Sequence, residues 1–273
     1  MTDASIEEFN FNPWVLWIIG GFSGFISGFF GIGGGVFIVP ALCMFLKYPI
    51  KRAIATSLGA IIVYATGGTI LHTFQSHSQI WQIVLFASIG AIPAARLGVK
   101  LRTKLPEQAL HLMFALVLFL ASFRIIFKDM FESWQIIPSD QYYWYLIVGI
   151  VGGLFSACLG IGGGVIMIPA MFIFGGIPME QASPTSLATV IIISASGIIF
   201  QKKLKTFHMP SMLHLAISGL IAAGLGAILL YWLSVNSPQM LQKLFGYLLI
   251  LIALRMILQL RVLRRKSSPA DDI

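Results

Sequence analysis

Two glycine-rich stretches carry the backbone groups best suited to chemistry in this chain. The first reads Gly-Ile-Gly-Gly-Gly-Val from Gly31 and the second repeats it from Gly160, with a proline following at Pro40 and Pro169. Consecutive glycines interrupt a helix, and a helix that starts after them presents unpaired N–H groups and about half a positive charge. Because glycine has no side chain, an anion can approach this backbone closely. The candidate anion-binding glycines are Gly33, Gly34, Gly35, Gly162, Gly163 and Gly164.

The two stretches belong to a duplication of most of the chain. Each residue of the second stretch lies 129 positions (160 − 31) after its counterpart. With the same offset, Thr56 and Ser57 fall on Thr185 and Ser186. The protein therefore contains two copies of one structural unit.

Each copy adds a hydroxyl pair and an arginine to the candidate substrate-binding residues. The hydroxyls are predicted in the first turn of a long helix, where such side chains either cap the helix or donate to an oxyanion. The arginines match once the offset drifts to 131 (255 − 124), and a cation inside an apolar segment either binds an anion or extends to the lipid headgroups. The glycines have an alternative role too, which is close helix packing. These candidates are Thr56, Ser57, Arg124, Thr185, Ser186 and Arg255.

The composition indicates that the protein lies in a membrane. Hydrophobic residues make up 58% of the 273 residues and charged residues only 10%, with a mean hydropathy of +0.89. A soluble domain has about 25% charged residues. The sequence thus predicts an all-α polytopic membrane protein. The net charge of +8 comes from basic residues clustered between apolar runs, which indicates membrane topology rather than binding to nucleic acid.

Apolar runs of about 20 residues predict transmembrane helices. A shorter run, 36–46 in the first copy and 165–174 in the second, follows each glycine stretch directly. Each repeat is therefore expected to contain a glycine-broken helical hairpin plus three long transmembrane helices. The long runs are 13–30, 54–73, 80–99 and 109–127 in the first copy, and 143–159, 182–200, 209–233 and 241–260 in the second.

Basic residues occupy different loops in the two copies. The clusters are Lys47, Lys51 and Arg52, then Arg96, Lys100, Arg102 and Lys104, then Lys202, Lys203 and Lys205, and finally Arg261, Arg264, Arg265 and Lys266. Since Lys and Arg favour the cytoplasmic side, the copies are predicted to be inverted-topology repeats with both chain termini in the cytoplasm. Each glycine stretch then bends a hairpin that returns to its own side, either as a re-entrant loop or as two paired helices.

The expected organisation has five parts. They are a cytoplasmic segment at 1–12, a membrane repeat at 13–128, an extracytoplasmic linker at 129–142, a second membrane repeat at 143–260 and a basic cytoplasmic tail at 261–273.

Enzymatic and metal-dependent chemistry have no candidate residues here. The ten acidic residues all fall outside the predicted spans or at their edges, and the five histidines are scattered. The two cysteines, Cys43 and Cys158, do not have a metal-binding spacing. We therefore expect no catalytic residues, no metal and no cofactor.

The motifs together resemble a known family. The repeated G-x-G-G-G with proline five residues on, the A-x-x-T-S-L that follows in both copies and an arginine in each last helix are similar to the sulfite exporter TauE/SafE family of bacterial membrane proteins. The sequence departs from the family at Ala55 and Pro184, where glycine commonly precedes the Thr-Ser pair.

The resemblance implies a transporter of sulfur-containing anions such as sulfite, thiosulfate or organosulfonates in the bacterial cell inner membrane. We expect a secondary transporter that works by alternating access. An anion channel of the same architecture and a carrier of another small organic anion are the alternatives. The expected partners are the small anion and the lipid bilayer, and the sequence also allows a homo-oligomer.

Overall fold

A computed structural model describes residues 12–74, 80–101, 112, 115–116, 118–119, 121–123, 125, 141–201 and 208–266. Seven helices in this part are long and apolar enough to cross a membrane, and none of the described residues lies in a strand. The prediction of an all-α polytopic membrane protein is thus confirmed. The long helices are α1 (Pro13–Phe30), α3 (Ile50–Phe74), α4 (Trp81–Leu101), α6 (Tyr145–Leu159), α8 (Met179–Gln201), α9 (Met209–Asn236) and α10 (Pro238–Lys266), and a short 3-10 helix, η2 (Tyr142–Trp144), leads into α6.

Two shorter helices, α2 (Gly35–Phe45) and α7 (Gly164–Gly175), follow the glycine stretches as expected. The predicted run 109–127 lies mostly outside the described residues, and those described between 112 and 125 are helical. Most of the predicted segments 1–12 and 129–142 also lies outside them. The last helix continues to Lys266, six residues beyond the predicted end of the final run.

Helices α3 and α8 begin earlier than predicted, and this corrects the expected place of the hydroxyl pairs. The carbonyl oxygens of Pro49 and Pro178 accept hydrogen bonds from the N–H groups four residues on, at 3.0 and 2.9 Å. The helices therefore start directly after these prolines, at Ile50 and Met179. Each Thr-Ser pair consequently lies in the second turn, too far along the helix to cap its N-terminus.

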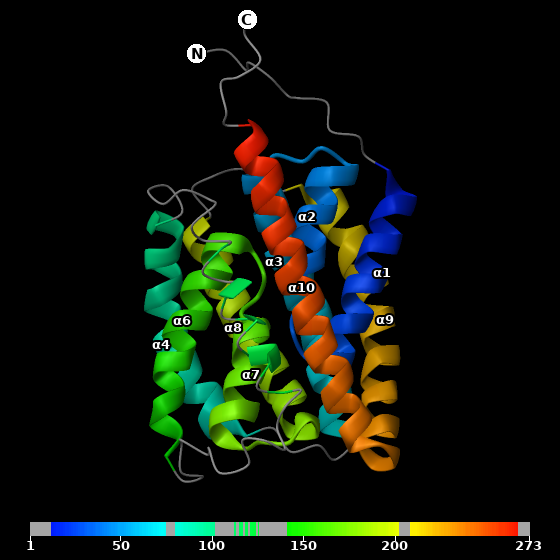
Figure 1. Cartoon of the computed structure of the whole chain (residues 1–273). Coiled ribbons are helices and arrows are strands. Elements are labelled where there is room, and N and C mark those ends of the chain that lie inside the picture. The colour runs from blue at the N-terminus through cyan, green and yellow to red at the C-terminus, as the bar shows by residue number, and fades with distance from the viewer. Residues whose placement is uncertain are drawn as a thin grey trace, which may run out of the picture.

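The glycine stretches form the bends of two helical hairpins. In Figure 1, α1 begins and α2 ends at the upper end of the molecule, whereas α6 begins and α7 ends at the lower end. The two hairpins therefore enter the bundle from opposite ends. Helix α10 crosses the front of the bundle and ends at the upper end, where α1 begins.

Each hairpin packs tightly against a helix of the other copy. Helices α1 and α9 lie side by side on the right of Figure 1, and α4 and α6 lie on the left. A Cβ added at Gly28 of α1 would lie 2.0 Å from the Ala223 oxygen of α9, and one at Gly149 of α6 would lie 2.0 Å from the Ala87 oxygen of α4. Such small residues let helix backbones touch, which is how membrane helices associate without a hydrophobic driving force between them.

Candidate functional site

The two glycine bends have nearly the same backbone conformation. The first glycine of each bend ends a helix, because its N–H donates to the carbonyl oxygen four residues earlier at 2.7 Å. The short helices α2 and α7 begin four residues later. Only glycine adopts left-handed conformations readily, so the folded bend requires glycine at the positions with positive φ. Those positions, with φ between 63° and 83°, are Gly31, Gly33, Gly34, Gly160, Gly162 and Gly163.

The two bends pack directly on each other. A Cβ added at Gly35 would lie 2.2 Å from the carbonyl oxygen of Gly160. In the matched contact, a Cβ added at Gly164 would lie 2.6 Å from the carbonyl oxygen of Gly31. The gap at these contacts has no room for a methyl group, so an anion can enter between the bends only when they separate.

Each bend is joined to a helix of the other copy by one buried serine. Ser57 of α3 donates from its hydroxyl to the Gly160 carbonyl oxygen at 3.1 Å. Ser186 of α8 donates to the Gly31 carbonyl oxygen at 2.9 Å. Both hydroxyls therefore hold the bends in place in this conformation, and direct binding of a substrate requires them to exchange these bonds.

The matched threonines differ in their surroundings. The Thr185 hydroxyl donates to the Gln181 carbonyl oxygen at 2.6 Å and accepts from the Ile80 N–H at 3.0 Å. The Thr56 hydroxyl is fully buried and has no hydrogen-bond partner within the described part of the chain. A buried hydroxyl without a hydrogen bond lowers the stability of the fold. Thr56 is therefore the one of the two threonines whose hydroxyl can bind another group without giving up a bond.

Tyr64 is a residue of the site that the sequence analysis missed. Its side chain is fully buried and its hydroxyl donates to the Gly33 carbonyl oxygen at 2.6 Å. Tyr64 lies seven residues after Ser57, which places both on the face of α3 that meets the bends. A comparison of the two copies could not reveal Tyr64, because its counterpart in the second copy is Ile193. The available signal was a tyrosine within an apolar helix, whose hydroxyl needs a partner when buried.

Hydrogen bonding leaves the bends with free donors. The carbonyl oxygens of Gly31, Gly33 and Gly160 all accept bonds from buried hydroxyls. The backbone hydrogen bonds of the described residues include none from the N–H groups of Gly33, Gly34, Gly162 or Gly163. Unpaired N–H groups at the start of a helix attract anions. The two bends are therefore the candidate anion-binding site of this chain.

Arg255 extends from α10 to the helix that follows the first bend. Its Nη1 donates to the carbonyl oxygen of Val36 at 3.3 Å, and the side chain is half-buried. The guanidinium thus lies beside the first turn of α2 rather than at an end of the bundle. The matched residue Arg124 lies outside the described residues.

Acidic and metal-binding groups are scarce around the site. Within the described ranges, Glu180 at the start of α8 is the only carboxylate. The same part of the chain contains no cluster of three His, Cys, Asp or Glu residues that could hold a metal ion. Without a nearby carboxylate, the arginine and the backbone donors keep their positive potential for an anion.

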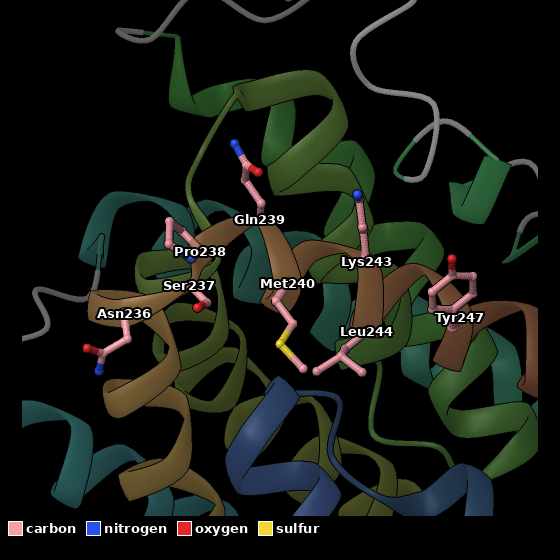
Figure 2. Close-up of a pocket in the computed structure, with 8 residues that line it drawn as sticks. All are labelled: Asn236, Ser237, Pro238, Gln239, Met240, Lys243, Leu244 and Tyr247. Carbon is pink, nitrogen blue, oxygen red and sulfur yellow. The ribbon is translucent and has the colours of Figure 1, made fainter.

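A hollow of about 670 Å³ lies away from the bends, at the turn between α9 and α10. Figure 2 shows Gln239 and Lys243 extending to one side of α10, and Met240 and Leu244 extending to the other. Lys243 is the one charged group in its lining, and no glycine of either bend contributes to it. The candidate site is therefore placed at the bends, where the buried donors converge.

A hydrogen-bonded cluster joins the loop after α2 to the start of α9, at the upper end of the bundle. The Tyr48 hydroxyl lies 2.5 Å from the Ser211 hydroxyl, which lies 2.7 Å from Nδ1 of His208. Nδ1 also accepts from the Ser211 N–H at 3.4 Å, so the histidine caps α9 in its neutral form. Burial, and after it the charge of Arg52, lowers the pKa of His208.

The cluster makes stability dependent on pH. The usual pKa of histidine is 6.5, and the folded value is lower. At a pH between the folded and the unfolded pKa of His208, the unfolded chain binds more protons than the folded protein. The folded protein therefore loses stability as the pH falls below about 6.5. A His208→Asn variant keeps a capping acceptor but cannot titrate. We expect the melting temperature of the wild type in detergent to fall more steeply between pH 7.5 and 5 than that of the variant. Parallel curves would contradict a role for His208.

A bundle of seven long apolar helices in the described part of the chain, with two glycine-broken helical hairpins meeting inside it, is typical of a membrane transporter. The family model described as sulfite exporter TauE/SafE matches residues 3–125 and 145–271. The chain belongs to this family, as its motifs indicated.

Individual relatives agree with this assignment. A probable membrane transporter protein of Haemophilus influenzae is 26% identical over 264 residues, which cover 89% of this chain and 97% of that protein. One of Methanocaldococcus jannaschii is 38% identical over 122 residues, 42% of this chain and 45% of that protein. The sulfite exporter TauE/SafE family protein 3 of Arabidopsis thaliana is 34% identical over 86 residues, 32% of this chain and 18% of that protein. No solved structure matches the chain.

Proposed function

We propose that the protein is a secondary transporter that carries a sulfur-containing anion across the bacterial inner membrane by alternating access. The observation that carries this proposal is the hydrogen bonding of the bends. The carbonyl oxygens of Gly31, Gly33 and Gly160 accept from buried hydroxyls, while four glycine N–H groups have no acceptor among the described residues. The sulfur chemistry of the substrate is supported by the name of the family and of its Arabidopsis member.

The distribution of basic residues supports an orientation in the membrane. In Figure 1, α2 and α4 end and α3 begins at the upper end of the molecule. Lys47 follows α2, Lys51 and Arg52 lie in the first turn of α3, and Lys100 lies in the last turn of α4. Because Lys and Arg favour the cytoplasmic side, the upper end, where α1 begins and α10 ends, faces the cytoplasm. The two hairpins then form inverted-topology repeats, with the bends meeting between the two membrane surfaces.

Contacts between the two copies support alternating access. At the cytoplasmic end, Tyr48 of the first copy contacts Ser211 of the second. At the outer end, the Ile80 N–H of the first copy donates to the Thr185 hydroxyl of the second. With both contacts formed and the bends touching, this conformation is occluded, and separating one end at a time admits the anion from one side only.

The threonine pair gives the two ends a means of alternation. Met209 is the counterpart of Ile80 at the same offset of 129 (209 − 80), and it starts α9 as Ile80 leads into α4. Thr56 is the counterpart of Thr185, and its hydroxyl has no partner among the described residues. In the state that opens to the outer side, the Met209 N–H bonds to Thr56 while Thr185 releases Ile80.

Uptake into proteoliposomes tests the proposal. The purified protein is given labelled sulfite, thiosulfate or ethanesulfonate, with and without the same unlabelled anion trapped inside. A carrier is expected to show saturable uptake that the trapped anion accelerates. Flux without this acceleration would identify a channel, and an absence of flux for all three anions would remove the sulfur-anion assignment.

A further inference from the structure

The two bends share a backbone conformation but face different side chains. A Cβ added at Gly34 would lie 2.7 Å from the Tyr64 hydroxyl oxygen, whereas one added at Gly163 would lie 2.9 Å from Cδ1 of Ile193. Tyr64 and Ile193 are counterparts at the offset of 129 (193 − 64). A hydroxyl group therefore stands at the first bend where the second bend has a methyl group.

A second matched pair differs in the same sense. The backbone oxygen of Ser23 lies beside Gly34, and that of its counterpart Gly152 lies beside Gly163. The Ser23 hydroxyl is fully buried and has no partner within the described ranges, and Gly152 has no side chain to match it. Each copy thus keeps the same helix position against its bend, but only the first copy has a hydroxyl at that position.

Arg255 adds a full charge next to the first bend, through its bond to the Val36 carbonyl oxygen at 3.3 Å. Its counterpart Arg124 lies outside the described residues, so the two arginines do not enter this comparison of the bends. Between the bends lies an apolar side chain: a Cβ at Gly33 or at Gly162 would lie 3.1 or 3.3 Å from Cγ1 of Val190.

We infer that the substrate binds in one orientation. Its charged group lies at the first bend beside Tyr64, and its uncharged end extends past Val190, between the bends, toward the second bend beside Ile193. This inference depends on the proposed function, because it says which end of the substrate lies at which end of the proposed binding site. Its ligand class is a small anion with one charged end and one apolar end, such as a short alkanesulfonate.

Sulfite and thiosulfate fit this arrangement less well. An inorganic oxyanion has no apolar end, and the part of it that meets Ile193 and Val190 loses water without gaining a donor from those side chains. An alkyl group loses no hydrogen bond there and gains burial. Each buried methylene improves affinity about fourfold, the equivalent of about 0.8 kcal/mol.

Binding to the purified protein in detergent tests the orientation without requiring transport. The rise in melting temperature with concentration gives the affinity of each anion. The probes are sulfite, methanesulfonate and ethanesulfonate. In the wild type we expect ethanesulfonate to bind about fourfold more tightly than methanesulfonate, and methanesulfonate to bind more tightly than sulfite.

Three variants separate the two ends of the site. The Tyr64 hydroxyl donates to the Gly33 carbonyl oxygen in this conformation and exchanges that bond for one to the bound anion. Tyr64→Phe removes this hydroxyl and is expected to weaken both alkanesulfonates by the same factor, about tenfold. Ile193→Ala is expected to remove the fourfold preference for the longer chain while changing methanesulfonate binding little. Tyr247→Phe alters an exposed tyrosine of α10, outside the bends, and is expected to change nothing. Ser23→Ala repeats the test of the charged end if Tyr64→Phe does not fold.

Two results would overturn the inference. Equal affinity for the three anions would show that the site does not distinguish a charged end from an apolar one. Loss of chain-length preference in Tyr64→Phe rather than in Ile193→Ala would reverse the orientation. If the wild type transports sulfite with trans-acceleration and either result is obtained, the inference fails while the proposed function stands.

Discussion

A Gly35→Ala substitution is expected to abolish transport and to lower the melting temperature of the purified protein. The added methyl group would lie 2.2 Å from the Gly160 carbonyl oxygen and 2.8 Å from Cα of Ile161, both in the opposite bend. Backbone atoms cannot move aside as the end of a side chain can, so the bends are forced apart and the occluded state is lost. Overpacking of this kind costs about 1–3 kcal/mol.

Gly21→Ala provides the matched control for this experiment. Gly21 lies in α1, and a Cβ added there meets nothing within 4 Å. Because alanine favours a helix more than glycine does, this variant is expected to be about 0.5–1 kcal/mol more stable and to transport normally. Valine at Gly34 or Gly163 is a less specific probe, since φ there is 63° and 82° and any side chain is strained. Normal transport by Gly35→Ala would show that the bends do not meet in the working protein.

The membrane helices and the glycine bends could be predicted from the sequence because their signals are local. An apolar run long enough to cross the bilayer identifies a span wherever it packs, and four glycines in five residues must break a helix. The predicted first span 13–30 agrees with α1 residue for residue. The starts of α3 and α8 were predicted three or four residues late, because hydropathy follows the apolar residues while the helix follows the prolines before them.

The partners of the site residues could not be predicted, because they come from the other copy. Ser57 and Ser186 were expected to cap their own helices or to bind a substrate, and each instead donates to the bend of the opposite repeat. Tyr64 was missed for a related reason. A comparison of the two copies selects residues that are the same in both, and Tyr64 and Ile193 are different. Their difference has a meaning only once the structure shows that Tyr64 faces the first bend and Ile193 faces the second.

A disulfide between cysteines at positions 80 and 185 is expected to stop transport reversibly. The Ile80 nitrogen and the Thr185 hydroxyl oxygen lie 3.0 Å apart, which brings the two backbones within about the 7 Å span that a disulfide bridges. An I80C/T185C protein that is oxidised cannot open its outer end, so a carrier is arrested, and a reducing agent restores transport. The background is a C43S/C158S protein, in which serine at position 158 can still donate to the Gly98 carbonyl oxygen as Cys158 does.

The matched pair T56C/M209C tests whether the two ends alternate. If Met209 bonds to Thr56 in the state that opens to the outer side, oxidation of this pair also arrests transport, by holding the cytoplasmic end closed. The four-cysteine protein is then expected to carry one disulfide or the other in each molecule, but not both, as measured by mass spectrometry after oxidation. Molecules with both disulfides would show that the two contacts coexist, and full transport by oxidised I80C/T185C would show that the outer contact is no gate. Either result would leave the proposed anion site at the bends in place and require a different route to it.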